Sequence, residues 1–189
     1  AKLIGIGDAA LQLEAGQAYN VVPAKASYQG PLLADLQAEL DRLGFDYELA
    51  DGSLTVLGLS RHAKDAAKGV NAIVRLAKAL RKWSDHPTLR FIADAVGEDA
   101  TGSSLFGLIT DEPSGDLSFN IAGLTLNQDF SEIRLDIRIP VLADKEDLVE
   151  TLSQKAAAYQ NLGINVTDLV SGSVANPGGA IVSVLGGMQ

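Results

Sequence analysis

The feature that most limits the possible folds is a repeated change in the spacing of apolar residues. Leucines recur every three or four residues over 32–43, the spacing of one helix face, and Gly44 follows where helices commonly end. Two apolar runs, 45–50 and 53–60, then flank Asp51-Gly52, a dipeptide favoured in tight hairpin turns. These signals predict a helix followed by an antiparallel hairpin.

Elements on either side of the hairpin indicate the class of fold. Residues 17–28 mix β-branched and aromatic side chains around Pro23, which predicts a strand with an edge or bulge at the proline. A second helix is predicted over about 69–83 from its apolar face. The order strand, helix, strand, strand, helix predicts an α+β fold, a ferredoxin-like antiparallel sheet with helices on one face.

The second half of the chain partly repeats this order. In chain order, its predicted elements are a helix (87–96), a loop (97–115), two strands (116–127 and 132–140), a helix with Asp144 as N-cap (144–159) and a strand (164–170). We therefore expect one domain over 1–170, with lobes of about 17–86 and 87–170. A two-lobed pseudo-repeat is an open alternative, although the halves lack convincing sequence identity. No element is predicted for the Gly-, Ser- and Ala-rich segment 171–189.

Composition argues against several classes of function. The formal net charge is −9, whereas a nucleic-acid partner would need clustered Lys and Arg. The chain has no cysteine, so disulfides and thiolate metal sites are ruled out. No apolar run approaches the roughly 18 to 20 residues that span a membrane, and no signal-peptide pattern is present. We expect a cytoplasmic protein without nucleic-acid or membrane partners.

The sequence also lacks a self-sufficient active site. Its only histidines, His62 and His86, are far apart, and neither an HExxH helix nor a Gly-rich phosphate loop is present. A Gly-x-Ser-x-Gly nucleophile motif is absent as well. Scattered carboxylates are usually solvated surface groups. We therefore expect no metal ion or cofactor to be bound by this chain.

His62 lies at the junction between the predicted strand 53–60 and the next helix. A single histidine at such a junction is more often structural than functional. The surrounding stretch 58–72 (GLSRHAKDAAKGVNA) resembles a known signature, G-x-x-x-H-A/S-x-x-P-x-x-G-x-N-A. That signature is typical of the lid, or dimerisation, domain of aminoacylase/carboxypeptidase-type zinc exopeptidases, which include carnosinases and PepV-type dipeptidases. Ala66 and Ala67 stand where the signature has proline.

Two further stretches resemble the PepV-type branch. Residues 20–23 (NVVP) resemble the N-x-V-P segment through which these chains enter the lid. Residues 110–120 (TDEPSGDLSFN) and 134–140 (RLDIRIP) resemble its DE-x-x-GDLT-x-N and LN-x-RYP patterns. Ile139 stands where that branch often has tyrosine, which leaves the substrate preference open. The resemblance covers about 11–170.

The resemblance implies a lid that closes over a dipeptide held by a separate catalytic domain with two zinc ions. It implies that His62 stabilises the oxyanion of the tetrahedral intermediate, that Arg138 binds the C-terminal carboxylate, and that Asn20 donates a further hydrogen bond to substrate. On this interpretation the isolated chain folds but hydrolyses nothing. The extra block 87–115 favours a monomer, because PepV-type lids imitate a dimer internally.

Each of these residues also has a structural interpretation. Without the motifs, Arg138 is a strand-surface arginine paired with Asp136 or Glu132, and Asn20 is a turn or bulge residue. Asn71 is more typical of a helix cap than of a substrate ligand. For the whole chain, the alternative is a ferredoxin-like module that binds a small molecule or oligomerises. A complete enzyme built from isolated carboxylates is the remaining, weaker alternative.

Overall fold

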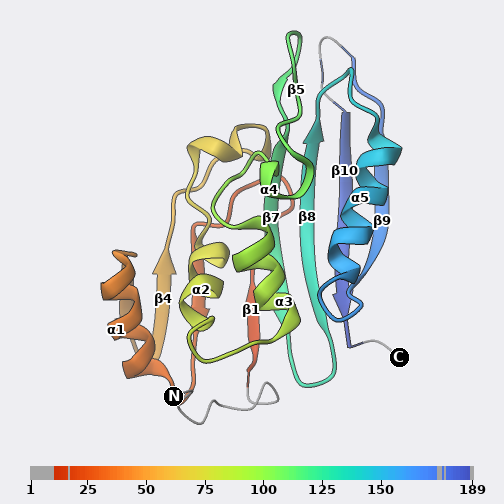
Figure 1. Ribbon diagram of the computed structural model, residues 1–189. Helices are drawn as coiled ribbons and strands as arrows, with labels where there is room; N and C mark the ends of the chain where they lie inside the picture. The colour runs from red at the N-terminus through yellow and green to blue at the C-terminus, as the bar shows by residue number, and fades with distance from the viewer. Residues whose placement is uncertain (1–10, 17, 174–175, 177, 188–189) are drawn as a thin grey trace.

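Two antiparallel sheets lie side by side, and helices cover one of their faces (Figure 1). This computed structural model describes residues 11–16, 18–173, 176 and 178–187. The remaining positions, which fall within the predicted domain 1–170 and the segment 171–189, lie outside the described residues. The predicted α+β class, with antiparallel sheets, is confirmed.

The larger sheet has five strands and the smaller has three. In spatial order, the first contains β1 (Leu13–Ala15), β7 (Ser118–Leu126), β8 (Ser131–Ile139), β10 (Gly178–Gly186) and β9 (Gly163–Val170). The second contains β2 (Lys25–Tyr28), β4 (Ser53–Leu57) and β3 (Tyr47–Ala50), while β5 (Thr110–Asp111) and β6 (Gly115–Asp116) form a separate hairpin. The helices are α1 (Leu33–Leu43), α2 (Ala72–Leu80), α3 (Pro87–Arg90), α4 (Ser103–Phe106) and α5 (Lys145–Ala157), with a 3₁₀ helix η2 (Ala63–Lys68) and a π-helical turn η3 (Phe91–Val96).

Local signals placed several elements correctly. α1 ends at Gly44, whose φ of 72° is the left-handed conformation expected of a C-terminal glycine. Asp51 and Gly52, with φ of 52° and 75°, form the turn between β3 and β4. Asp144 caps α5 by accepting a hydrogen bond from the Asp147 N–H at 3.0 Å. These three predictions are confirmed.

Two predicted boundaries differ from the structure. The strand expected over 17–28 is limited to β2, and Pro23 precedes it, because proline cannot donate to a sheet ladder. The second helix begins at Ala72 rather than near 69, because the Asn71 side chain caps it by accepting bonds from the N–H groups of Ile73 and Val74. The interpretation of Asn71 as a helix cap is thus confirmed.

The segment 171–189, for which no element was predicted, contains an interior strand of the larger sheet, β10. β10 pairs with β8 on one side and with β9 on the other, and its inward residues Ala180, Val182 and Val184 are buried. Gly178 and Gly179 begin the strand and weaken its sequence signal, because glycine is disfavoured in strands. The second lobe therefore extends beyond residue 170.

Each sheet contains the same arrangement of three strands and one helix. β2 and β3 both run antiparallel to the intervening β4, so they are parallel to each other and are connected through α1. β8 and β9 are related in the same way through β10 and α5. The two lobes thus share a split β-α-β-β unit, although neither sheet establishes the full ferredoxin-like topology.

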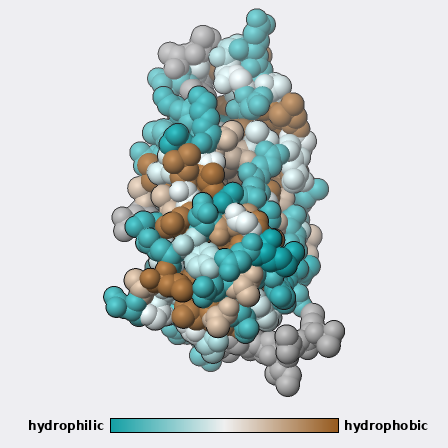
Figure 2. All heavy atoms as spheres, turned by 90° about the vertical axis from the view of Figure 1, so that its left-hand side faces the viewer, coloured by the Kyte–Doolittle hydropathy of each residue, from teal (hydrophilic) through white to brown (hydrophobic). Residues whose placement is uncertain are grey.

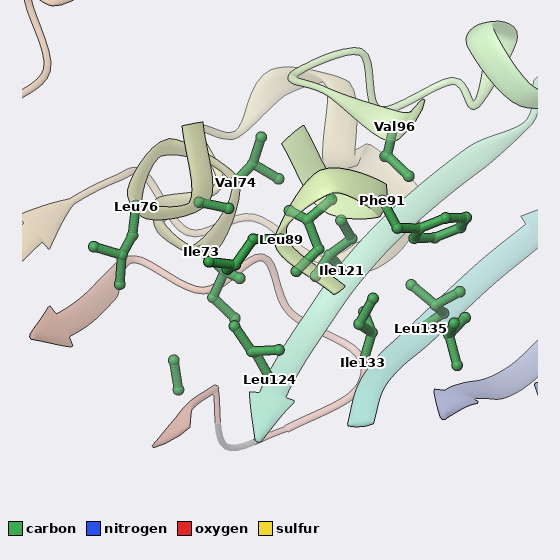
Figure 3. Packing of buried hydrophobic residues seen from close by; sticks show 14 of the residues in the cluster. Ile73, Val74, Leu76, Leu89, Phe91, Val96, Ile121, Leu124, Ile133 and Leu135 are labelled. Carbon is green, nitrogen blue, oxygen red and sulfur yellow. The ribbon is translucent and has the colours of Figure 1, made fainter. Parts of the chain in front are cut away.

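The core lies between the sheets and the helices. Figure 3 shows Ile121 and Leu124 of β7 and Ile133 of β8 directed toward Ile73 of α2 and Leu89 of α3. On the side of the molecule that carries α1 and β4, apolar groups are separated by hydrophilic side chains, as on an ordinary solvent-exposed face (Figure 2). Among the described residues, no helix combines the length and apolar character needed to cross a membrane.

A buried ion pair joins α1 to the end of α2 and gives a test of the packing. The side chain of Glu39 is 3% exposed, its Oε1 accepts a hydrogen bond from Arg42 Nε at 2.9 Å, and Lys82 Nζ lies 3.2 Å from Oε2. The hydrogen bond from Arg42, together with Lys82, holds the pKa of the Glu39 carboxyl below its usual 4.5. The charged form of Glu39 therefore stabilises the fold above about pH 4.5, and this contribution is lost as the pH falls through the lowered pKa.

Replacing Glu39 with glutamine should lower the free energy of unfolding by about 1–3 kcal/mol at pH 7. The difference from the unsubstituted protein should shrink as the pH falls below about 4.5 and the native carboxyl takes up its proton. Urea unfolding at pH 7 and pH 3 measures both values. Glu150→Gln, on an exposed position of α5, is the control and should change stability by less than about 0.5 kcal/mol. If Glu39→Gln lowered the free energy of unfolding by the same amount at pH 3 as at pH 7, the charge of Glu39 would not be the source of the stabilisation.

Candidate functional site

The three predicted site residues lie on segments that meet at one end of the sheets, the upper end in Figure 1. Asn20 follows β1 in the connection to β2, His62 precedes η2 after the end of β4, and Arg138 is near the C-terminal end of β8. The strand directions bring these connections together, since β1, β4 and β8 all run toward this end. The three segments therefore lie at the same end of the sheets, and the shared substrate face expected of Asn20, His62 and Arg138 stays a prediction.

The segments that carry Asn20 and His62 are joined through their backbones. The N–H of Ala63 donates to the carbonyl of Asn20 at 2.8 Å, and the N–H of Val22 donates to the carbonyl of Arg61 at 2.8 Å. The side chains of Asn20 and His62 are both exposed. The backbone is thus fixed, while both side chains remain accessible to a ligand.

The His62 imidazole has a defined tautomer. Its Nδ1 accepts a hydrogen bond from the Lys64 N–H at 3.1 Å and so caps η2. An accepting Nδ1 carries no proton, so the proton of the neutral ring lies on Nε2, which becomes a hydrogen-bond donor. Where the resembled signature has proline, Ala66 is buried in η2. The segment with alanine in place of the proline of the signature forms a 3₁₀ helix, and His62 is the N-cap of this helix.

Arg138 has the partner expected from its structural interpretation. Its Nε and Nη2 donate to the two carboxylate oxygens of Asp136 at 2.8 and 2.9 Å. The Asp136 side chain is 2% exposed, whereas that of Arg138 is 30% exposed. These hydrogen bonds raise the pKa of the Arg138 guanidinium, which stays charged. Glu132, the other partner considered, pairs with Arg134 instead.

A polar pocket of about 330 Å³ lies between Arg138 and the residues that follow His62. Its lining includes Lys64 and Asp65 from η2, Asp116 from β6 and Arg138 from β8. The pocket therefore offers cations to a carboxylate and carboxylates to an ammonium group. A second hollow, of about 520 Å³, lies between β1 and β2 and is lined mostly by small apolar residues.

Two residues of β7 that were not singled out from the sequence hold the site together. Ser118 donates its hydroxyl hydrogen to the carbonyl of Ala63, next to His62. Asn120 donates through Nδ2 to the carbonyls of Tyr19 and Val21, on either side of Asn20, at 3.2 and 2.8 Å. Two signals were available: both residues lie in the 110–120 stretch that resembles the PepV-type pattern, and they are polar at alternate positions of a mostly apolar strand.

Metal ligands do not gather in the described part of the chain. Within residues 11–16, 18–173, 176 and 178–187, no group of three or more His, Asp or Glu side chains is placed to hold a metal ion. The two zinc ions implied by the resemblance belong to a separate catalytic domain and remain a prediction.

The fold and site together define an α+β domain with an accessible polar site at one end of its sheets. No model of a known protein family matches the chain, and no curated protein sequence matches it. Its function is therefore proposed from the site together with the motif resemblance.

Proposed function

We propose that this chain is the lid domain of a PepV-type dipeptidase. In that role it closes over a dipeptide bound to a separate catalytic domain, which supplies two zinc ions. The observation that supports the proposal is that the segments carrying Asn20 and His62 are joined through their backbones and lie against β7, whose Ser118 pairs with Arg138 of β8. On this proposal the parent enzyme is cytoplasmic and the lid is monomeric.

The chemistry of His62 suits stabilisation of an oxyanion. Its Nδ1 is engaged by the Lys64 N–H, so its Nε2–H is the donor for a substrate. A donor held in position before reaction stabilises negative charge that develops on the carbonyl oxygen, without reorganisation during the step. Lid closure would bring this donor to a dipeptide held by the catalytic domain and would exclude water from it.

The environment of Arg138 suits a carboxylate ligand. Asp136 fixes the guanidinium plane through Nε and Nη2, which leaves Nη1 with no hydrogen-bond partner among the described residues. Lys64 lines the same pocket and adds positive charge. The C-terminal carboxylate of a dipeptide would therefore bind between Arg138 and Lys64, with Asp136 buried behind the arginine.

The polar pocket also supports a second candidate function. Its cations and carboxylates could bind a small zwitterion without any catalytic domain, as in a ligand-binding module. Such a module would bind a free amino acid directly, whereas the lid requires a metal-bound dipeptide. The two functions can be distinguished by whether the parent gene also encodes a metal-binding catalytic domain.

The flanking coding sequence tests the proposal. We expect His-x-Asp and Glu-Glu metal motifs before this domain and a further metal-binding histidine after it. The purified chain, incubated with zinc or manganese, should release no amino acids from dipeptides in a ninhydrin assay, because the metal ligands are elsewhere. Hydrolysis by the chain alone, or flanking sequence without metal motifs, would contradict the lid. Binding of a free amino acid in the latter case would favour the module.

A further inference from the structure

Two neighbouring polar residues project from one face of β7 into the base of the site. Ser118 lies opposite Arg138 in the sheet register, and Asn120 lies opposite Asp136. Ser118 is 6% exposed and Asn120 is 1% exposed. The four side chains therefore form a compact polar group on two adjacent strands, directly beneath the segments that carry Asn20 and His62.

The hydrogen bonds of this pair are specific for those two segments. Ser118 binds the carbonyl of Ala63, the residue after His62. Asn120 binds the carbonyls on both sides of Asn20 with its single amide nitrogen. Each contact joins parts of the chain that are more than 50 residues apart in the sequence. Hydrogen bonds from β7, the strand that pairs with β8, therefore hold the two segments that carry the exposed side chains of Asn20 and His62.

The orientation of the Asn120 amide is set by its two backbone contacts. Its Oδ1 is buried and has no hydrogen-bond partner among the described residues. The orientation of the amide is fixed because the two carbonyls require the donor, which leaves the oxygen unsatisfied. A buried acceptor without a partner destabilises the fold, whereas an apolar side chain at this position would leave the carbonyls of Tyr19 and Val21 without this donor. The Asn120 side chain therefore keeps its amide nitrogen on these two carbonyls although its oxygen has no partner within the described part of the chain.

We infer that Ser118 and Asn120 are positioning residues that hold His62 and Asn20 in a fixed arrangement beside Arg138. The inference rests on the proposed function, because it assigns the arrangement to substrate recognition. Asn120 does not line the polar pocket, and Ser118, which does line it, donates its hydroxyl hydrogen to the carbonyl of Ala63. They act by restricting the two connecting segments, so that the three ligands belong to one rigid body when the lid closes.

Amide hydrogen exchange measures this restriction directly. The N–H groups of Ala63 and Val22 form the backbone link between the two segments. Ser118→Thr and Ser118→Val add the same bulk and differ only in the hydroxyl group. We expect exchange at both amides to be about tenfold faster in the valine variant than in the threonine variant, as for loss of one buried hydrogen bond. Amides of β8 and β10 should exchange at equal rates in both.

Asn120→Asp provides a second variant if the valine variant does not fold. Aspartate has the same shape, but it replaces the donor nitrogen with an oxygen that faces two carbonyls. The same two amides should again exchange faster. Ser183→Thr and Ser183→Val are the matched controls, since Ser183 is equally buried, at 6%, but lies on β10 beside Arg134. This control pair should leave Ala63 and Val22 unchanged.

The outcomes separate the inference from the proposed function. Faster exchange at the amides of Ala63 and Val22 in Ser118→Val, but not in Ser118→Thr, supports the positioning role. The inference would be overturned if these two amides exchanged at equal rates in both Ser118 variants. It would also be overturned if exchange became faster evenly over the whole sheet. Flanking sequence without metal motifs would instead remove the dipeptidase function while leaving the exchange pattern as expected.

Discussion

Replacing His62 with asparagine should lower kcat by about 100- to 1000-fold in a dipeptidase that contains this domain. Asparagine can still accept the hydrogen bond from the Lys64 N–H, because it is a favoured N-cap residue. The substitution therefore preserves η2, while the Nδ2–H groups of asparagine lie closer to the backbone and do not reach the position of the histidine Nε2–H. Steady-state kinetics with a panel of unmodified dipeptides, together with thermal unfolding, would measure both effects.

The other histidine provides a matched control. His86 Nδ1 accepts a hydrogen bond from the Thr88 N–H at 3.1 Å and caps α3, much as His62 caps η2. It lies beside the β7–β8 turn, at the opposite end of the sheet from Arg138. His86→Asn should therefore leave kcat unchanged. An equal loss of activity in both variants, or no loss in either, would count against the role proposed for His62.

Replacing Arg138 with methionine should lower the free energy of unfolding by about 3 kcal/mol. The reason is that Asp136, whose side chain is 2% exposed, would remain buried without its partner. The double substitution Arg138→Met with Asp136→Leu should recover most of this loss, because it removes both charges together. Urea unfolding of the single and double variants gives the coupling between the two side chains.

Arg134→Met is the control for this comparison. Arg134 occupies the same face of β8, but its partner Glu14 is 65% exposed and its partner Glu132 is 30% exposed. Water can solvate both carboxylates once the arginine is removed, so the loss should be about 1 kcal/mol or less. Equal destabilisation by Arg134→Met and Arg138→Met would show that burial of Asp136 is not the deciding factor.

Elements fixed by local chemistry could be predicted from the sequence. The leucine spacing and Gly44 defined α1, Asp51-Gly52 defined the β3–β4 turn, and Asp144 defined the start of α5. In each case the deciding interaction lies within a few residues of the chain. Conformation then follows from local sterics and capping, which a single sequence reveals.

β10 could not be predicted in the same way. Its stability comes from pairing with β8 and β9 and from the burial of Ala180, Val182 and Val184. The glycines at its start weaken any local preference for a strand. Strand formation here depends on tertiary contacts, which a single sequence does not display.

The candidate site likewise contains residues that could be predicted from the sequence and residues that could not. Asn20, His62 and Arg138 were selected through motifs, and the structure brings their segments together. The contribution of Ser118 and Asn120 was not foreseen, because their partners are backbone carbonyls of distant segments. Every residue has a backbone carbonyl, so the sequence does not indicate which carbonyl a side chain will contact. Such contacts can be recognised only in the structure.

The position of β10 between β8 and β9 has a consequence for folding during translation. β9 and β8 are synthesised first, yet neither can complete its ladder until residues up to Gly186 have left the ribosome. Until then, the open edges of β8 and β9 are exposed for pairing with other nascent chains, a recognised route to aggregation. The second lobe is therefore the part of the molecule for which a ribosome-associated chaperone should matter most.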